Sequence, residues 1–263
     1  MLSALESANL KLIRAEKQID TIRGIIMDFL SDEPSVVTKQ PDGSHEFKFV
    51  ERPPDDISLF AGEVIYQIRS ALDHLAFGLV KLNRSGITLP IDWEENCAFP
   101  MWLRTPKKPP NFNCFKSTLP GITKEAFTFI EMVQPYNRGE VGVWLERLAA
   151  LSNIDKHRYL TVIKGQAQRR DEATVMYKGM KMIGSSVVRV EDGAKTDSPF
   201  IGAPDVQILD MHVCGAFHPF VSFSDPTLDP GVKAFPVQDL LQTFLDQVQR
   251  MIVPAFDKFI NQP

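Results

Sequence analysis

Apolar residues recur at the spacing of an α-helix in four long stretches of this chain, and this periodicity constrains its fold more than any other feature. In the second stretch, positions three or four residues apart form one broad apolar stripe: Phe60, Val64, Ile68, Ala71, Leu72, Leu75 and Leu79. The same period predicts helices over Leu5–Leu30, Ile57–Leu82, Ile122–Ile154 and Val237–Ile260. We therefore expect a bundle of four long helices.

Local signals indicate where these helices begin, break and bend. Ser3-Ala-Leu-Glu6 has the pattern of a capping box, and Pro53-Pro54-Asp55-Asp56 places aspartates beside the free N–H groups of the second helix. The proline and glycine of Gln134–Gly139 break the third stretch into two helices. Pro254 is expected to kink the last one.

The pattern changes after His157, where β-forming residues alternate with turn residues. Strands are expected at Tyr159–Ile163, Thr174–Ile183, Val187–Val190, Val206–Val213 and Phe220–Phe223. A hairpin is expected where Val36–Thr38 and Phe47–Val50 flank Pro41-Asp42-Gly43-Ser44. The sequence thus predicts one α+β domain over residues 1–263, with a helical bundle from 1–158 and 236–263 and a small antiparallel sheet in a β-rich insertion at 159–235.

Composition and charge narrow the classes of protein. The net charge of −4 gives no overall attraction to polyanions, so a nucleic-acid site has to be a local basic patch. Cys97, Cys114 and Cys214 form no Cys-x-x-Cys pair, which is typical of reduced thiols. The sequence has neither an export signal nor a membrane-spanning apolar run. We expect a cytoplasmic protein with no membrane contact.

Arg69 and His74 carry the clearest chemical signal, because they lie in the second predicted helix with four residues between them. A guanidinium matches phosphate oxygens, and an imidazole titrates near neutral pH. Together they suit metal-free cleavage of RNA, with His74 as the base and Arg69 as the phosphate clamp. Their side chains leave the helix about 140° apart, so they converge only by reach or across the two-fold axis of a homodimer.

An arginine, four residues and a histidine on a long helix resembles the motif of HEPN domains. The resemblance covers the helical stretches and implies a metal-independent endoribonuclease of defence systems that acts as a dimer on RNA. The motif's arginine and histidine correspond to Arg69 and His74. Ser70 follows the arginine, where active members commonly carry Asn, Asp or His.

Ser70, Asp73, Asp155 and His157 are candidates for supporting roles. Asp73 can pair with Arg69 along the helix, and Ser70 can hydrogen-bond to His74. Asp155 lies near the centre of an apolar stripe and needs a polar partner, so we expect residues 153–158 to meet the second helix in space. There Asp155 would either orient a histidine or neutralise Arg69.

The alternative to catalysis is an interaction or structural module. In this interpretation the arginine, aspartate and histidine residues form a buried polar network or a dimer contact. A metal site from Asp73, His74, Asp155 and His157 lacks the usual ligand spacing, and no glycine-rich cofactor motif is present, so neither a metal nor a cofactor is predicted.

Weaker signals lie elsewhere in the chain. Lys107-Lys108 and Gln168-Arg169-Arg170 are expected in loops, either as plain solvated loops or as a phosphate-binding rim beside Arg69. His212 and Cys214 would share one face of a strand, which permits zinc or thiol chemistry or a partly solvated strand.

Overall fold

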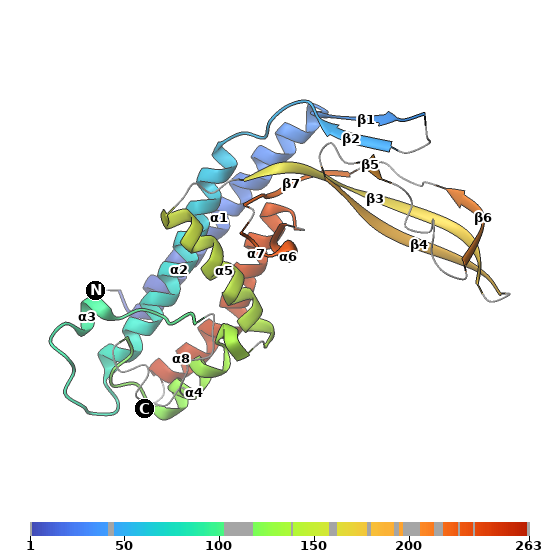
Figure 1. The fold of residues 1–263 in the computed structure, drawn as a ribbon. Coiled ribbons are helices and arrows are strands. Elements are labelled where there is room, and N and C mark those ends of the chain that lie inside the picture. The colour runs from blue at the N-terminus through green and yellow to red at the C-terminus, as the bar shows by residue number, and fades with distance from the viewer. Residues whose placement is uncertain are drawn as a thin grey trace. The chain divides into compact units, whose positions relative to one another are not determined.

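The chain has the α+β class predicted from its sequence. The computed structural model describes residues 2–41, 45–102, 118–137, 139–157, 162–177, 180–191, 195–196, 206–212, 218–225, 227–233 and 235–261. They form two compact units (Figure 1). The helical unit comprises Met1–Ile22, Ser58–Leu160 and Gln238–Pro263, and the β-rich unit comprises Arg23–Ile57 and Thr161–Val237. That these units form the single predicted domain stays a prediction.

Helices occupy each of the four stretches predicted from the apolar period. They are α1 (Ala4–Ser31), α2 (Asp56–Leu82), the short α3 (Trp93–Asn96), α4 (Lys124–Met132), the 3-10 turn η1 (Pro135–Asn137), α5 (Glu140–His157), α7 (Val237–Gln247), the π turn η2 (Val248–Ile252) and α8 (Val253–Asn261). The third stretch is divided by η1, as its proline and glycine predict. Their finer arrangement as a four-helix bundle stays a prediction.

The capping-box signal at the start of α1 is confirmed. The Ser3 backbone N–H donates to Glu6 Oε2 at 2.7 Å, and the Glu6 N–H donates to Ser3 Oγ at 3.1 Å, which is a capping box. α2 ends at Leu82, and the next residue, Asn83, has a φ of 43° that turns the chain out of the helix. The π turn η2 comes directly before Pro254, whose ring would clash with a carbonyl of a regular helix.

The predicted stripe of α2 forms part of the core of the helical unit. Val64, Ile68, Leu72 and Leu75 have no exposed surface. α1 and α2 lie side by side and antiparallel in Figure 1. Further along α1 from its start, the buried Gln18 donates to Glu63, which lies nearer the beginning of α2. This pairing of helix faces fixes which side chains of α2 can meet α1.

Two antiparallel sheets make up the β-rich unit. In the first, the predicted hairpin β1 (Ser35–Lys39) and β2 (His45–Phe49) is joined by β5 (Lys195–Thr196). In the second, the long strand β3 (Val162–Tyr177) pairs with β4 (Met180–Glu191) on one side. On its other side it pairs with β7 (His218–Phe223) near its start and with β6 (Val206–His212) near its end. α6 (Pro230–Lys233) follows these strands.

Two sequence predictions in this unit are wrong. The single strand expected over Thr174–Ile183 is interrupted, because β3 ends at Tyr177 and Met180 pairs back against it. The basic group Gln168-Arg169-Arg170, expected in a loop, lies inside β3, where its backbone pairs with β4. In both places the pairing of β3 with β4 determines the structure more than the local sequence does.

Aromatic residues hold the core of the β-rich unit. The fully buried Phe47 of β2 packs with the fully buried Ala167 of β3. The ring of Phe49 contacts that of Phe47 at 5.2 Å between centroids and stacks on Phe29 of α1 at 6.0 Å. Burial of one face of β2 therefore sets the register of the hairpin.

Substitution of Gly78 tests whether α1 and α2 pack as closely as the structure shows. A Cβ atom at this position would lie 2.5 Å from Ala4 Cβ, which is closer than two carbon atoms can pack. We expect Gly78→Ala to lower the free energy of unfolding by about 1–3 kcal/mol, measured by urea denaturation. The matched control is Gly24→Ala in α1, where nothing lies within 4 Å of the added Cβ. That variant should gain about 0.5–1 kcal/mol, and a similar loss in both would contradict the close contact.

Candidate functional site

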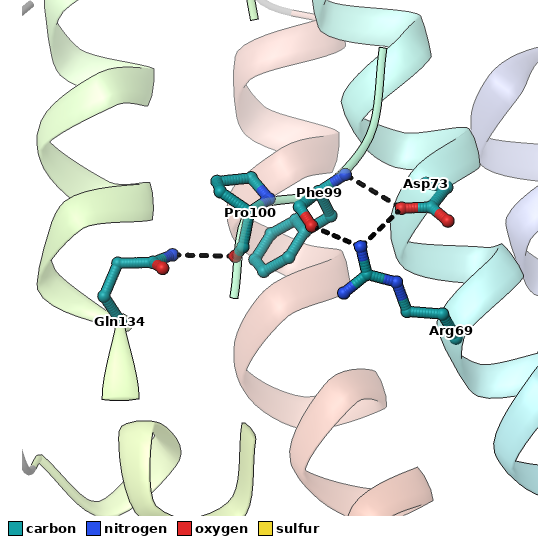
Figure 2. A network of polar contacts seen from close by, with 5 residues as sticks. All are labelled: Arg69, Asp73, Phe99, Pro100 and Gln134. Atoms are coloured by element: carbon teal, nitrogen blue, oxygen red, sulfur yellow. Dashed lines mark hydrogen bonds and ion pairs between the residues drawn. The ribbon is translucent and has the colours of Figure 1, made fainter. Parts of the chain in front are cut away.

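The side chain of Arg69 is engaged with two oxygen atoms. Its Nη2 atom donates to the Phe99 carbonyl at 2.6 Å and lies 3.3 Å from Asp73 Oδ1 (Figure 2). The ion pair with Asp73 follows the four-residue spacing along the helix. Only 20% of the Arg69 side chain is exposed. The guanidinium is therefore used inside the protein.

Phe99–Trp102 form what we call the clamped segment, because side chains of the helical unit bind its backbone at both ends. The Phe99 N–H donates to Asp73 Oδ1 at 2.8 Å. At the other end, Gln134 Oε1 accepts from the Trp102 N–H at 3.0 Å. Gln134 Nε2 donates to the Pro100 carbonyl, also at 3.0 Å (Figure 2). Gln134 is fully buried, so these bonds satisfy an amide that water does not reach.

Burial dominates the electrostatics around Asp73. It raises the pKa of the Asp73 carboxyl, and the charge of Arg69 and the hydrogen bond from Phe99 only partly oppose it. The folded chain thus holds this proton more tightly than the unfolded chain, so ionisation of Asp73 costs stability as the pH rises through its pKa. Burial, reinforced by Asp73, raises the pKa of the nearby Cys97 thiol to about 12, so this cysteine is a poor nucleophile.

His74 faces α1 instead of Arg69. Its Nδ1 atom lies 2.9 Å from Ser7 Oγ, so the predicted bond to Ser70 is replaced by one to the first turn of α1. Burial lowers the pKa of His74, the nearby Lys11 ammonium lowers it further, and Asp73 raises it. No hydrogen bond or ion pair joins His74 to Arg69, both of which the structure describes.

Asp155 takes part neither in the contacts of Arg69 with the clamped segment nor in the contact of His74 with Ser7. It is exposed, although desolvation of its carboxyl raises its pKa, and no hydrogen bond or ion pair links it to the described side chains of Arg69 or His74. The next residue, Lys156, lies close enough to Asp73 for its charge to lower that carboxyl's pKa. His157 is the last residue of α5, and its side chain lies outside the described part of the chain. Lys156, within the stretch expected to meet the second helix, thus influences α2.

An aromatic contact covers Phe77, a ring on the polar side of α2. Phe77 stacks on Trp93 of α3, with ring centroids 5.1 Å apart. Another element therefore covers the helix at Phe77. The irregular segment that follows α2 therefore packs along it at Trp93 and again at Phe99.

Sequence reasoning missed three residues that make these contacts. The sequence places Gln134 only at the start of a helix break, and Ser7 and Lys11 only within the first predicted helix. None of them lies in a motif, because each acquires its partner through tertiary folding. A glutamine in an otherwise apolar neighbourhood was the one signal that could have pointed to Gln134.

The weaker candidates contribute no described site. Lys107, Lys108, Cys114 and Cys214 lie outside the described residues. His212 ends β6 and His218 begins β7. Within the described ranges no group of three or more His, Cys, Asp or Glu residues could hold a metal ion. No helix in the part searched is long and apolar enough to cross a membrane.

The comparisons with known proteins found no match: no family model, no curated protein and no solved structure is similar to this chain. The contacts of Arg69, Asp73 and His74 are therefore the basis for proposing a function.

Asp73→Ala tests the clamped segment. It removes the acceptor of the Phe99 N–H and the partner of Arg69, so we expect the free energy of unfolding at pH 7 to fall by about 1–3 kcal/mol. Asp73→Asn keeps an oxygen acceptor without a buried charge, and it should lose clearly less. Urea denaturation measures both variants. Equal losses would show that the hydrogen bond to Phe99 contributes nothing.

The lowered pKa of His74 should make the free energy of unfolding sensitive to acid. Its folded pKa is lowered below the unfolded value of 6.5, so its contribution is present above that pH and is lost as the pH falls through the folded pKa. Between pH 7.5 and pH 5, the wild type should therefore lose more free energy of unfolding than His74→Gln, in which this group cannot titrate. Parallel pH profiles would rule out the assignment.

Proposed function

We propose that this protein is a non-catalytic interaction module in which the arginine and aspartate of α2 have a structural role. The observation that carries the proposal is the engagement of Arg69, whose Nη2 atom lies close to both the Phe99 carbonyl and Asp73. A phosphate clamp needs a guanidinium that can release its partners and reach a substrate. Arg69 instead helps to hold the backbone of the clamped segment.

The different neighbours of Arg69 and His74 support the same proposal. Arg69 binds the clamped segment, whereas His74 binds Ser7 of α1. A general base and a phosphate-binding cation have to contact one substrate group at the same time. Within one copy of the chain these two side chains are directed to different elements. A homodimer and a four-helix bundle, both expected from the sequence, remain part of the proposal.

RNA cleavage by an HEPN-like protein is the rival function, and one observation favours it. Burial and Lys11 lower the pKa of His74, which leaves its imidazole neutral and able to accept a proton at pH 7. A second copy of the chain would then have to supply the missing cation. The ribonuclease hypothesis requires that the wild-type protein cleave RNA without metal and that the His74→Ala variant not cleave it.

Incubation of the purified chain with single-stranded RNA in EDTA distinguishes the two functions. We expect no cleavage above background. We also expect Arg69→Ala to lower the free energy of unfolding by about 1–3 kcal/mol, because it leaves the Phe99 carbonyl and Asp73 without their donor. Cleavage by the wild type, lost in His74→Ala and Arg69→Ala variants that remain folded, would overturn the interaction module.

Arg52→Ala is the matched control for the stability measurement. Arg52 also pairs with an aspartate, Asp55, at 3.0 Å, but the two side chains are 83% and 86% exposed. A solvent-exposed ion pair contributes little, so this variant should change stability by less than about 0.5 kcal/mol. A loss as large as that of Arg69→Ala would mean that the position of Arg69 against the clamped segment is unimportant.

A further inference from the structure

A second group of polar side chains lies where the first two turns of α1 meet α2. We call Ser7, Lys11, Tyr66 and His74 the seam cluster. Ser7 Oγ lies 2.9 Å from His74 Nδ1. Lys11 follows Ser7 by one helical turn, and its Nζ atom lies 5.5 Å from the centroid of the Tyr66 ring. The cluster shares no hydrogen bond with the clamped segment.

Positive charge in the seam cluster is not neutralised by a bonded carboxylate. Among the described residues, neither Lys11 nor His74 forms an ion pair with an acidic group. Asp73 raises the pKa of His74, but its Oδ1 atom already accepts from the Phe99 N–H and pairs with Arg69. Lys11 from α1 and burial between the helices both disfavour a second positive charge on His74. An anion bound here would relieve this repulsion.

We propose that the seam cluster binds a phosphoryl group, which Lys11, Ser7 and His74 contact together. The three acceptor oxygens of a phosphoryl group match one ammonium and two hydrogen-bond donors. His74 takes up one proton from solvent when the anion binds. Its Nδ1–H then donates to Ser7 Oγ, which frees the Ser7 hydroxyl proton to donate to a phosphoryl oxygen.

Tyr66 has a positioning role in this site. Its side chain is exposed, and a cation above its ring is attracted to the ring's negative face. The contact restricts the Lys11 side chain against α2, one helical turn along α1 from Ser7, so less side-chain freedom is lost when the anion binds. The site lies apart from the Arg69 contacts, so the inference goes beyond the proposed function and does not depend on it.

Titration of the His74 ring by proton NMR tests the site with inorganic phosphate as the probe. His74→Asn identifies the resonance among the chain's five histidines. We expect saturating phosphate to raise the pKa of His74 by about one unit, because the anion favours the charged imidazole. Sodium chloride at equal ionic strength is the control for screening. An equal rise in chloride would overturn the proposal.

Substitutions in α1 test whether Lys11 and Ser7 are needed for phosphate to change the pKa of His74. Lys11→Met should abolish the saturable response of His74 to phosphate, and Ser7→Ala should weaken phosphate binding about tenfold through loss of one charge-assisted bond. Lys17→Met is the matched control, because Lys17 is exposed on the same helix and belongs to no contact of the cluster. It should retain the full response. An unchanged response in Lys11→Met would overturn the proposal.

A final comparison separates the two sources of a phosphoryl group. Phenyl phosphate carries the group as an ester, whereas inorganic phosphate is the free ion. Tighter binding of phenyl phosphate assigns the site to an esterified ligand, and tighter binding of inorganic phosphate assigns it to the free ion. Either result supports a phosphoryl site. If neither compound saturates His74, no such site exists.

Discussion

The packing of the helical unit depends on the hydrogen bonds that side chains make to the backbone N–H and carbonyl groups of Phe99–Trp102. No described strand pairs with this segment, yet Phe99 is fully buried and its ring lies 6.1 Å from that of Phe256 in α8. Buried N–H and carbonyl groups must find partners, and an unpaired group costs about 1–3 kcal/mol. Asp73, Arg69 and Gln134 provide those partners. Three side chains thus take the place of a neighbouring strand and tie the segment to the helices on either side.

This arrangement divides the polar residues of α2 between two neighbours. Side chains five positions apart leave a helix about 140° from one another. Arg69 and Asp73 consequently face the clamped segment, while His74 faces Ser7 of α1. A motif defined by spacing along the sequence gives no information on which element covers each side of the helix. Residues of α1 therefore determine the hydrogen-bond partner of His74 and contribute to its lowered pKa.

Helix positions were predictable, because a sustained 3.6-residue period and capping residues are local properties. The capping box of Ser3 and the break before Gly139 are examples. The strand expected over Thr174–Ile183 was wrong because Gly179 is its only turn signal, and β-forming residues continue on both sides of the reversal. Within the site, the ion pair of Arg69 with Asp73 was predictable from spacing. The contacts of Gln134 and Ser7 were not, because they join residues far apart in the sequence.

The central position of β3 determines the order in which its sheet can assemble. The hairpin with β4 closes at Tyr177 and Met180, which are near neighbours in the chain, whereas Val162 must wait for Phe223. Loop closure costs more entropy as the loop lengthens, so local pairing forms first. During synthesis, β3 therefore has β4 along one edge while the other edge waits for β6 and is completed only when β7, the last strand, leaves the ribosome. An open edge of this kind attracts other chains, so this interval is when the newly made protein is most prone to aggregate.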